Sequence, residues 1–101
     1  MTTTAPQWRD QASALRYLAA KVARVHGPTH PDMGTLAEVV AALADSRDDD
    51  RAAHTALAAR LRDLTGGFRP WPGACASVHQ LFQGLGAVAA SLPVTPIVEQ
   101  P

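Results

Sequence analysis

Asp50 and His54, two side chains that bind metals and transfer protons, stand four residues apart in a stretch typical of a helix. Residues at this spacing are neighbours on one helix face. The pair could supply two ligands of a metal centre, or a carboxylate that orients an imidazole. We favour the alternative, an ordinary pair on a helix surface, because Leu57 and Ala58 one turn further on add no polar group.

Cys75 and His79 are also four residues apart, at the start of another expected helix. A thiolate and an imidazole could bind zinc or copper if two more ligands converged on them. We favour a packing role, with a small buried thiol and an imidazole on the surface. Cys75 is the single cysteine, so no intramolecular disulfide can form and the chain fits a reducing compartment.

His26, His30 and Met33 form a third group, which resembles a copper-binding run in its residue types. Gly27 and Pro28 break the helix between the two histidines, so their relative placement is open. Metal binding is the less favoured interpretation here. Elsewhere the chain has no Gly-rich phosphate loop, nucleophile elbow or Cys-x-x-Cys motif, and no spacing that assembles a catalytic relay.

The helices that must position these groups follow from apolar residues at three- and four-residue steps. A first helix is expected from about Pro6 to the stop at Gly27-Pro28, and its inward stripe consists of Trp8, Ala12, Leu15, Leu18, Ala19, Val22 and Val25. A short second helix should start at Thr35, because Thr35 and Glu38 have the capping-box spacing. Its stripe is Leu36, Val39, Val40 and Leu43.

Ser46 and Asp49 repeat the capping-box spacing and predict the start of a third helix, which Gly66-Gly67 should close. Its inward residues are Ala53, Leu57, Leu61 and Leu64. The prolines of the segment 68–73 exclude a helix there and indicate a rigid connector whose aromatics cover the end of the molecule. A fourth helix runs from about Ala74 to Ser91, with an apolar stripe made of Val78, Leu81, Phe82, Leu85, Val88 and Leu92.

Four amphipathic helices with short links predict an all-α fold, a small up-down helical bundle over residues 1–92 followed by an extended, proline-containing tail over 93–101. Nine basic and nine acidic residues cancel, so no field of one sign favours nucleic acid as a partner. No window approaches the ~20 apolar residues of a membrane span, and the first ten residues do not resemble a signal peptide. We therefore expect no membrane partner and a cytoplasmic location.

Two stretches of the chain resemble the iron–sulfur cluster repair di-iron family, which comprises hemerythrin-like proteins linked to nitric oxide and oxidative stress. The string from Lys21 to Gly27 followed by His30-Pro31-Asp32-Met33 is similar to the end of that family's first helix and the loop after it. The segments 58–67, 70–75 and 78–92 are similar to its last two helices and their proline-rich link. The resemblance covers about half of the chain and implies a hemerythrin-like bundle.

The same resemblance implies a di-iron centre, but the matching positions lack most of its ligands. No histidine precedes His26, although the first-helix ligand should fall near Ala5. The second helix runs out where a His-x-x-x-Glu pair is expected, and the third-helix ligand falls near Asp50 or Arg51. The last pair falls on Thr95 and Glu99, so only its carboxylate is kept.

We expect a degenerate hemerythrin-like protein without a cofactor, a non-catalytic binding or accessory protein in nitric oxide, oxidative-stress or iron–sulfur cluster physiology. A homodimer or a helical protein partner would cover its apolar seam. The alternative is an iron-binding protein that takes part in iron–sulfur cluster repair or redox chemistry. Its rebuilt metal site would draw on Asp50, His54, Cys75, His79 and Glu99.

Overall fold

The computed structural model describes residues 7–92, and within them every regular element is a helix. The helices are α1 (Gln7–His26), α2 (Asp32–Asp45), α3 (Arg51–Leu64) and α4 (Ala76–Ser91). The predicted all-α fold and the number of helices are confirmed. Glu99 and the rest of the predicted tail lie outside the described residues.

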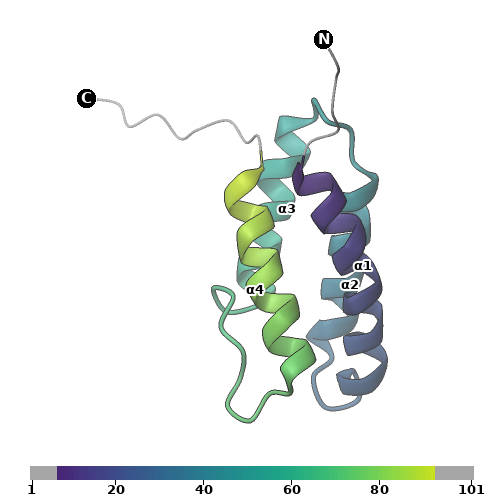
Figure 1. Ribbon diagram of the computed structural model, residues 1–101, viewed down its shortest axis with the longest axis vertical. Coiled ribbons are helices and arrows are strands. Elements are labelled where there is room, and N and C mark those ends of the chain that lie inside the picture. Colours follow the sequence, from purple (N-terminus) through teal and green to yellow (C-terminus); the bar gives the residue numbers. More distant parts are fainter. Residues whose placement is uncertain (1–6, 93–101) are drawn as a thin grey trace, which may run out of the picture.

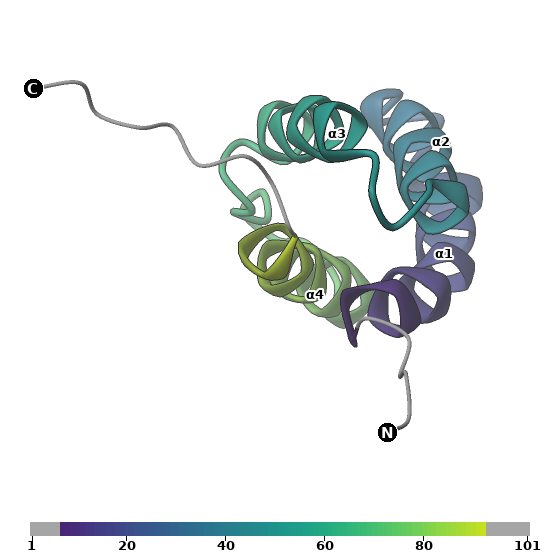
Figure 2. The same cartoon turned by 90° about the horizontal axis from the view of Figure 1, so that it is seen from above.

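The four helices run alternately up and down and form a ring when seen along the bundle (Figures 1 and 2). Each helix lies beside its neighbours in sequence, and α4 closes the ring against α1. The contact between α3 and α4 is the smallest of the four. Because α3 and α4 are antiparallel, their first residues lie at opposite ends of the bundle, which decides where the candidate site residues fall.

The core follows the predicted apolar stripe most closely in α4, where five of the six predicted residues are buried, and the sixth, Leu92, is buried directly after the helix. Helix α2 contributes a second buried stripe, made of Met33, Leu36, Val39, Val40, Leu43 and Ala44. Each fully buried Leu or Val side chain stabilises the fold by roughly 1.5–3 kcal/mol relative to an exposed one. Helices α2 and α4 therefore hold most of the apolar core.

Two of the predicted stripes are corrected by the structure. Val25, in the last turn of α1, is 59% exposed and does not belong to the core. In α3, Leu61 is fully buried whereas Leu57 and Leu64 are only half-buried, and His54 occupies the second interior position. A helix that packs mainly against one neighbour buries only a narrow stripe, and His54 and Leu61 are seven residues apart on that stripe.

The starts of α2 and α3 also differ from the prediction. Helix α2 begins at Asp32, three residues before Thr35, because the backbone N–H groups of Met33 and Gly34 already bond to the carbonyls of His30 and Pro31. Helix α3 begins at Arg51, and the Asp50 carboxylate accepts a hydrogen bond of 3.0 Å from Ala53 N. Both helices have 14 residues, the shortest of the four.

The connector from α3 to α4 has the predicted irregular form. Gly66 and Gly67 follow α3 with φ values of +61° and +81°, which only glycine adopts without strain. Phe68 then packs against the core, and its ring lies so close to Gly86 that a Cβ atom there would stand 3.4 Å from Cγ of Phe68. Gly84 allows a similar approach by Leu15 of α1, so both glycines of α4 mark close packing.

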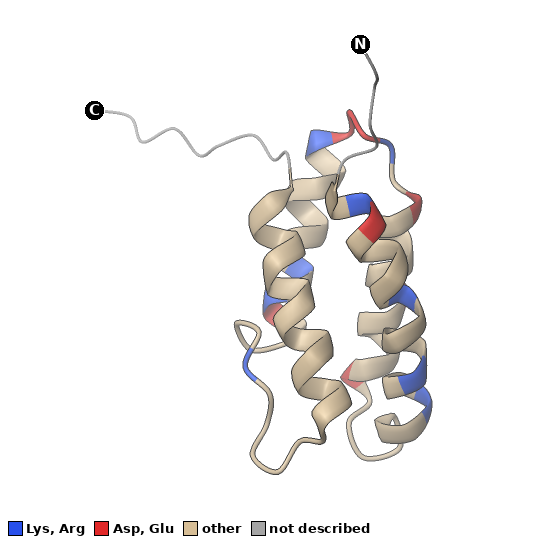
Figure 3. Ribbon diagram, in the orientation of Figure 1, with Lys and Arg blue, Asp and Glu red and all other residues tan. Residues whose placement is uncertain are grey.

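Charged residues are distributed unevenly over the bundle (Figure 3). Helix α1 carries basic side chains along its length, and acidic residues gather around the link between α2 and α3. Helix α4 carries no Lys, Arg, Asp or Glu. Within residues 7–92, no helix combines the length and the apolar character needed to cross a bilayer.

Candidate functional site

The described candidate metal ligands fall into two groups at opposite ends of the bundle. Asp50 and His54 lie at the start of α3, whereas Cys75 and His79 lie at the start of the antiparallel α4. The structure does not bring these four residues together, and Glu99 is outside the described residues. Over residues 7–92, no three His, Cys, Asp or Glu side chains are grouped as metal ligands would be.

His54 is fully buried, so the favoured interpretation of a surface pair with Asp50 is wrong. The Asp50 carboxylate caps α3, while the imidazole turns into the bundle beside Trp8 of α1. The centres of the His54 and Trp8 rings are 4.8 Å apart and their planes meet at 71°, an edge-to-face contact. The apolar period of α3 did not reveal this position, because a histidine interrupts the stripe.

The hydrogen bonds of Ser46 assign the tautomer of His54. The Ser46 hydroxyl donates its one hydrogen to the Leu43 carbonyl at 2.7 Å, so its oxygen is left to accept from His54 Nε2 at 3.1 Å. Nε2 therefore carries a hydrogen, and in the neutral imidazole Nδ1 is an acceptor. Both Nδ1 and the indole Nε1 of Trp8 are buried without a hydrogen-bond partner among the described residues.

Arg9 ties α1 to the end of α2 at this end of the bundle. Its guanidinium donates to the Ala44 carbonyl at 2.7 Å and to the Ser46 carbonyl, and it pairs with Asp48. The same group lies 4.8 Å from the centre of the Trp8 ring. Arg9 thus donates hydrogen bonds to carbonyl groups at the end of α2 that have no partner within the helix, which is a structural role.

The other end of the bundle brings Cys75 together with His26 instead of His79. Cys75 Sγ lies 3.2 Å from Nε2 of His26, which stands in the last turn of α1. The thiol is exposed, so the predicted packing role for a buried thiol is wrong. The reason is that Cys75 precedes the first residue of α4, on the rim next to α1, and does not share the inward stripe.

Trp71 of the connector organises the aromatic side chains at this end. His30 stacks on its indole with ring centres 3.8 Å apart, and His26 approaches it edge-on at 5.7 Å. On the inner side, Phe82 of α4 meets Trp71 at 6.0 Å. The prediction that the connector's aromatics cover the end of the bundle is confirmed, and the two histidines are held by an indole. Met33 is buried in the core.

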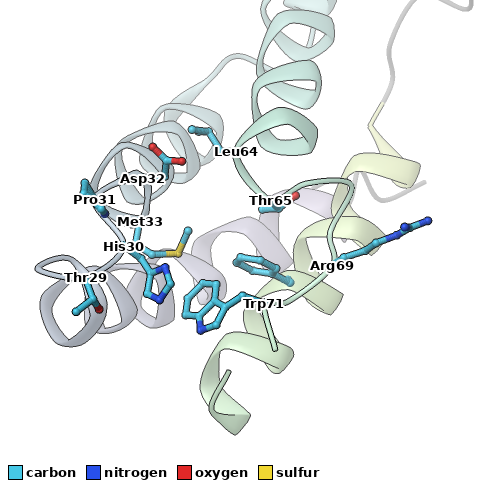
Figure 4. A pocket seen from close by; sticks show the side chains of 10 residues that line it. Thr29, His30, Pro31, Asp32, Met33, Leu64, Thr65, Arg69 and Trp71 are labelled. Atoms are coloured by element: carbon cyan, nitrogen blue, oxygen red, sulfur yellow. The ribbon is translucent and has the colours of Figure 1, made fainter. Parts of the chain in front are cut away.

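A cavity of about 290 Å³ opens beside Trp71, between the start of α2, the end of α3 and the connector (Figure 4). Apolar and polar side chains line it together: Met33, Leu64, Trp71 and Phe82, with Thr29, His30, Pro31, Asp32, Thr65 and Arg69. We call it the Trp71 cavity. The Thr65 hydroxyl donates to Leu61 O at 2.7 Å and accepts from Phe68 N, and Arg69 extends away from the opening. Polar and apolar groups therefore share the wall of the cavity.

Sequence reasoning did not find the Trp71 cavity, because its walls come from three segments far apart in the chain. The signals that were present are the aromatic connector and the His26–Met33 run, which meet only in the folded structure. Comparisons of the chain with protein-family models, with curated proteins and with solved structures find no match.

Proposed function

We propose that the protein is a non-catalytic binding protein whose ligand site is the Trp71 cavity. The observation that carries this proposal is a concave, aromatic-walled space of about 290 Å³ at one end of a closed helical bundle. Sites for small molecules are typically concave and apolar with a few polar groups at defined places. The Trp71 cavity is concave and combines apolar side chains with several polar groups.

The lining favours a small ligand with an apolar body. Met33, Leu64 and the rings of Trp71 and Phe82 offer apolar surface, whereas the carboxylate of Asp32 and the hydroxyl of Thr29 belong to exposed residues at the rim. A ligand with one hydrogen-bonding group at its edge would satisfy both parts of the site. The volume limits it to a compact molecule.

Two matched substitutions on α3 test the proposal. Leu64 and Leu57 are both half-buried leucines of this helix, but only Leu64 lines the cavity. We expect compact aromatic fragments that bind the wild type to lose at least about tenfold in affinity in Leu64→Phe, which fills the space, and to bind Leu57→Phe unchanged. Equal affinity for both variants in calorimetric titrations would contradict the proposal.

The resemblance of residues 21–33 and 58–92 to the iron–sulfur cluster repair family supports a physiological setting for this binding role. We propose that the bundle is a hemerythrin-like scaffold that serves nitric oxide, oxidative-stress or iron–sulfur cluster physiology as an accessory protein. The up-down order of four helices and the proline-rich connector before α4 support this assignment.

The second candidate function is iron binding in iron–sulfur cluster repair or redox chemistry. The observation that favours it is the interior imidazole of His54, whose Nδ1 is buried and free of hydrogen bonds to described residues. An uncommitted imidazole nitrogen with its other nitrogen fixed by a hydrogen bond is the usual state of a histidine ligand. Near-equimolar iron after anaerobic purification, lost in His54→Ala, would establish this function and displace the first.

We further propose that the bundle associates with a second copy through α1 and α4. Gln11, Ala14, Leu15, Gly84 and Ala87 line an apolar hollow between these helices. Because α4 has no charged residue, its part of this face brings no charge against a second copy.

A further inference from the structure

We propose that Cys75 and His26 form a thiol–imidazole pair that undergoes thiol–disulfide exchange with small disulfides, a chemistry separate from ligand binding in the Trp71 cavity. The two residues are 49 positions apart in the chain. Their contact joins the last turn of α1 to the residue that precedes α4. Three independent features carry the proposal: the contact between the two groups, the access to the sulfur, and a hollow beside it.

The first feature is the distance of 3.2 Å between Cys75 Sγ and Nε2 of His26. An imidazole nitrogen at this distance can accept the thiol proton as the sulfur becomes a nucleophile. Trp71 holds the imidazole edge-on with ring centres 5.7 Å apart, so His26 is packed in place. His79, one turn along α4, makes no such contact with the thiol among the described residues.

The second feature is the freedom of the thiol. Cys75 is exposed, and although it occupies the N-cap position of α4, its side chain makes no capping hydrogen bond. The sulfur is therefore not committed to a backbone partner of the helix. The first turn of α4 contains no acidic residue.

The third feature is a hollow of about 110 Å³ whose wall includes both Cys75 and His26. Lys21, Val22, Val25 and Ser77 line it together with His26 and Cys75. The exposed Val25 gives one wall an apolar surface, and Lys21 adds a positive charge. The hollow thus suits a small disulfide with an apolar portion and an anionic group.

The exchange balances without a cofactor. The sulfur of Cys75 attacks one sulfur of the small disulfide, a new S–S bond to the protein forms, and the original S–S bond breaks. The thiol proton passes to His26, and the second half of the disulfide leaves as a thiolate. The protein sulfur is oxidised and the leaving sulfur is reduced, so the small disulfide is the only oxidant.

Two probes test the proposal on the full chain, the anionic dithiobis(nitrobenzoate) and the uncharged hydroxyethyl disulfide. The second-order rate constant of adduct formation is measured by thiolate release and by intact mass, with Cys75→Ser as the blank. We expect His26→Gln to lower the rate constant on the order of tenfold for both probes, and His79→Gln to leave it within about twofold. Equal rates for the wild type and His26→Gln would overturn the proposal.

A second variant tests the hollow without touching the imidazole or the fold. Val25 is exposed, so Val25→Glu should leave the helicity unchanged while placing a carboxylate in the wall. We expect a fall of about fivefold in the rate constant for the anionic probe and a smaller one for the uncharged probe. A folded chain that reacts no faster than the same chain in denaturant would also overturn the proposal. None of these outcomes depends on a ligand in the Trp71 cavity, so the two proposals fail independently.

Discussion

At the scale of single residues, the interior of this bundle is held by a polar chain as well as by apolar contacts. The Ser46 hydroxyl links the Leu43 carbonyl of α2 to the imidazole of His54 in α3. Because His54 is fully buried, losing its hydrogen-bond partner costs free energy that solvent water does not make up. Ser46 was predicted to open α3, and it instead closes α2 and fixes the tautomer of a histidine.

Ser46→Ala should therefore destabilise the fold more than an ordinary hydroxyl deletion. It leaves the Nε2–H of His54 buried without an acceptor, which costs about 1–3 kcal/mol. The control is Ser91→Ala, because the exposed Ser91 hydroxyl donates only to the Ala87 carbonyl of its own helix. Urea unfolding of both variants measures the difference. Equal losses of unfolding free energy would show that the Ser46–His54 bond is not important.

Arg9 gives a second residue-scale prediction through comparison with Arg16. Both lie on α1 and pair with an aspartate of the α2 region, but only Arg9 also donates to two backbone carbonyls. Arg9→Ala should lower the free energy of unfolding by about 1.5–3 kcal/mol, as expected for charge-assisted hydrogen bonds. Arg16→Ala should cost less than about 1 kcal/mol, because its ion pair is exposed. The reverse order in urea unfolding would disprove the assignment.

At the scale of helices, an element could be predicted from the sequence where its apolar residues lie on a single face. The stripe of α4 was fully predicted, because its five buried apolar residues have no competitor on another face. Helix starts were harder to predict. Thr35 and Glu38 have the spacing of a capping box, but α2 already begins at Asp32, because the N–H groups of Met33 and Gly34 bond to backbone carbonyls before it. The contacts between Cys75 and His26 and between Arg9 and Ser46 join distant segments, and no local pattern encodes them.

Two glycines with opposite roles test this description of the helix ends. Gly34 lies inside α2 with open space where a Cβ would stand, so Gly34→Ala should stabilise the fold by up to about 1 kcal/mol. Gly67 also faces open space but has a φ of +81°, so Gly67→Ala should destabilise it by about 1 kcal/mol through backbone strain. Thermal unfolding gives both signs. The same sign for both substitutions would contradict the described ends of α2 and α3.

At the scale of the whole molecule, the two ends of the bundle hold different groups of side chains. One end holds the Arg9 and His54 contacts that connect α1, α2 and α3, and the other carries the Trp71 cavity and the Cys75–His26 pair. None of the nine basic and nine acidic residues of the chain belongs to α4. This leaves one uncharged helix face beside the hollow formed with α1.

Self-association through that face is expected to be sensitive to charge. Ala87→Glu places a carboxylate on the exposed side of α4 next to the hollow and, across a two-fold axis, opposes it to its own copy. Sedimentation velocity at high concentration should show a dimer for the wild type and a monomer for Ala87→Glu. Ala56→Glu on the exposed face of α3 serves as the control and should remain dimeric. A monomeric wild type would contradict the proposed association.

The most direct test of the binding proposal uses the two tryptophans of the chain as reporters of the two ends. The indole ring of Trp8 contacts His54, and Trp71 lines the cavity. In nitrogen–proton NMR spectra recorded during titration with compact aromatic fragments, we predict that the Trp71 indole signal shifts saturably while the Trp8 signal stays in place. A Trp71 signal that no fragment moves, or shifts confined to Trp8, would contradict the assignment of the Trp71 cavity as the ligand site.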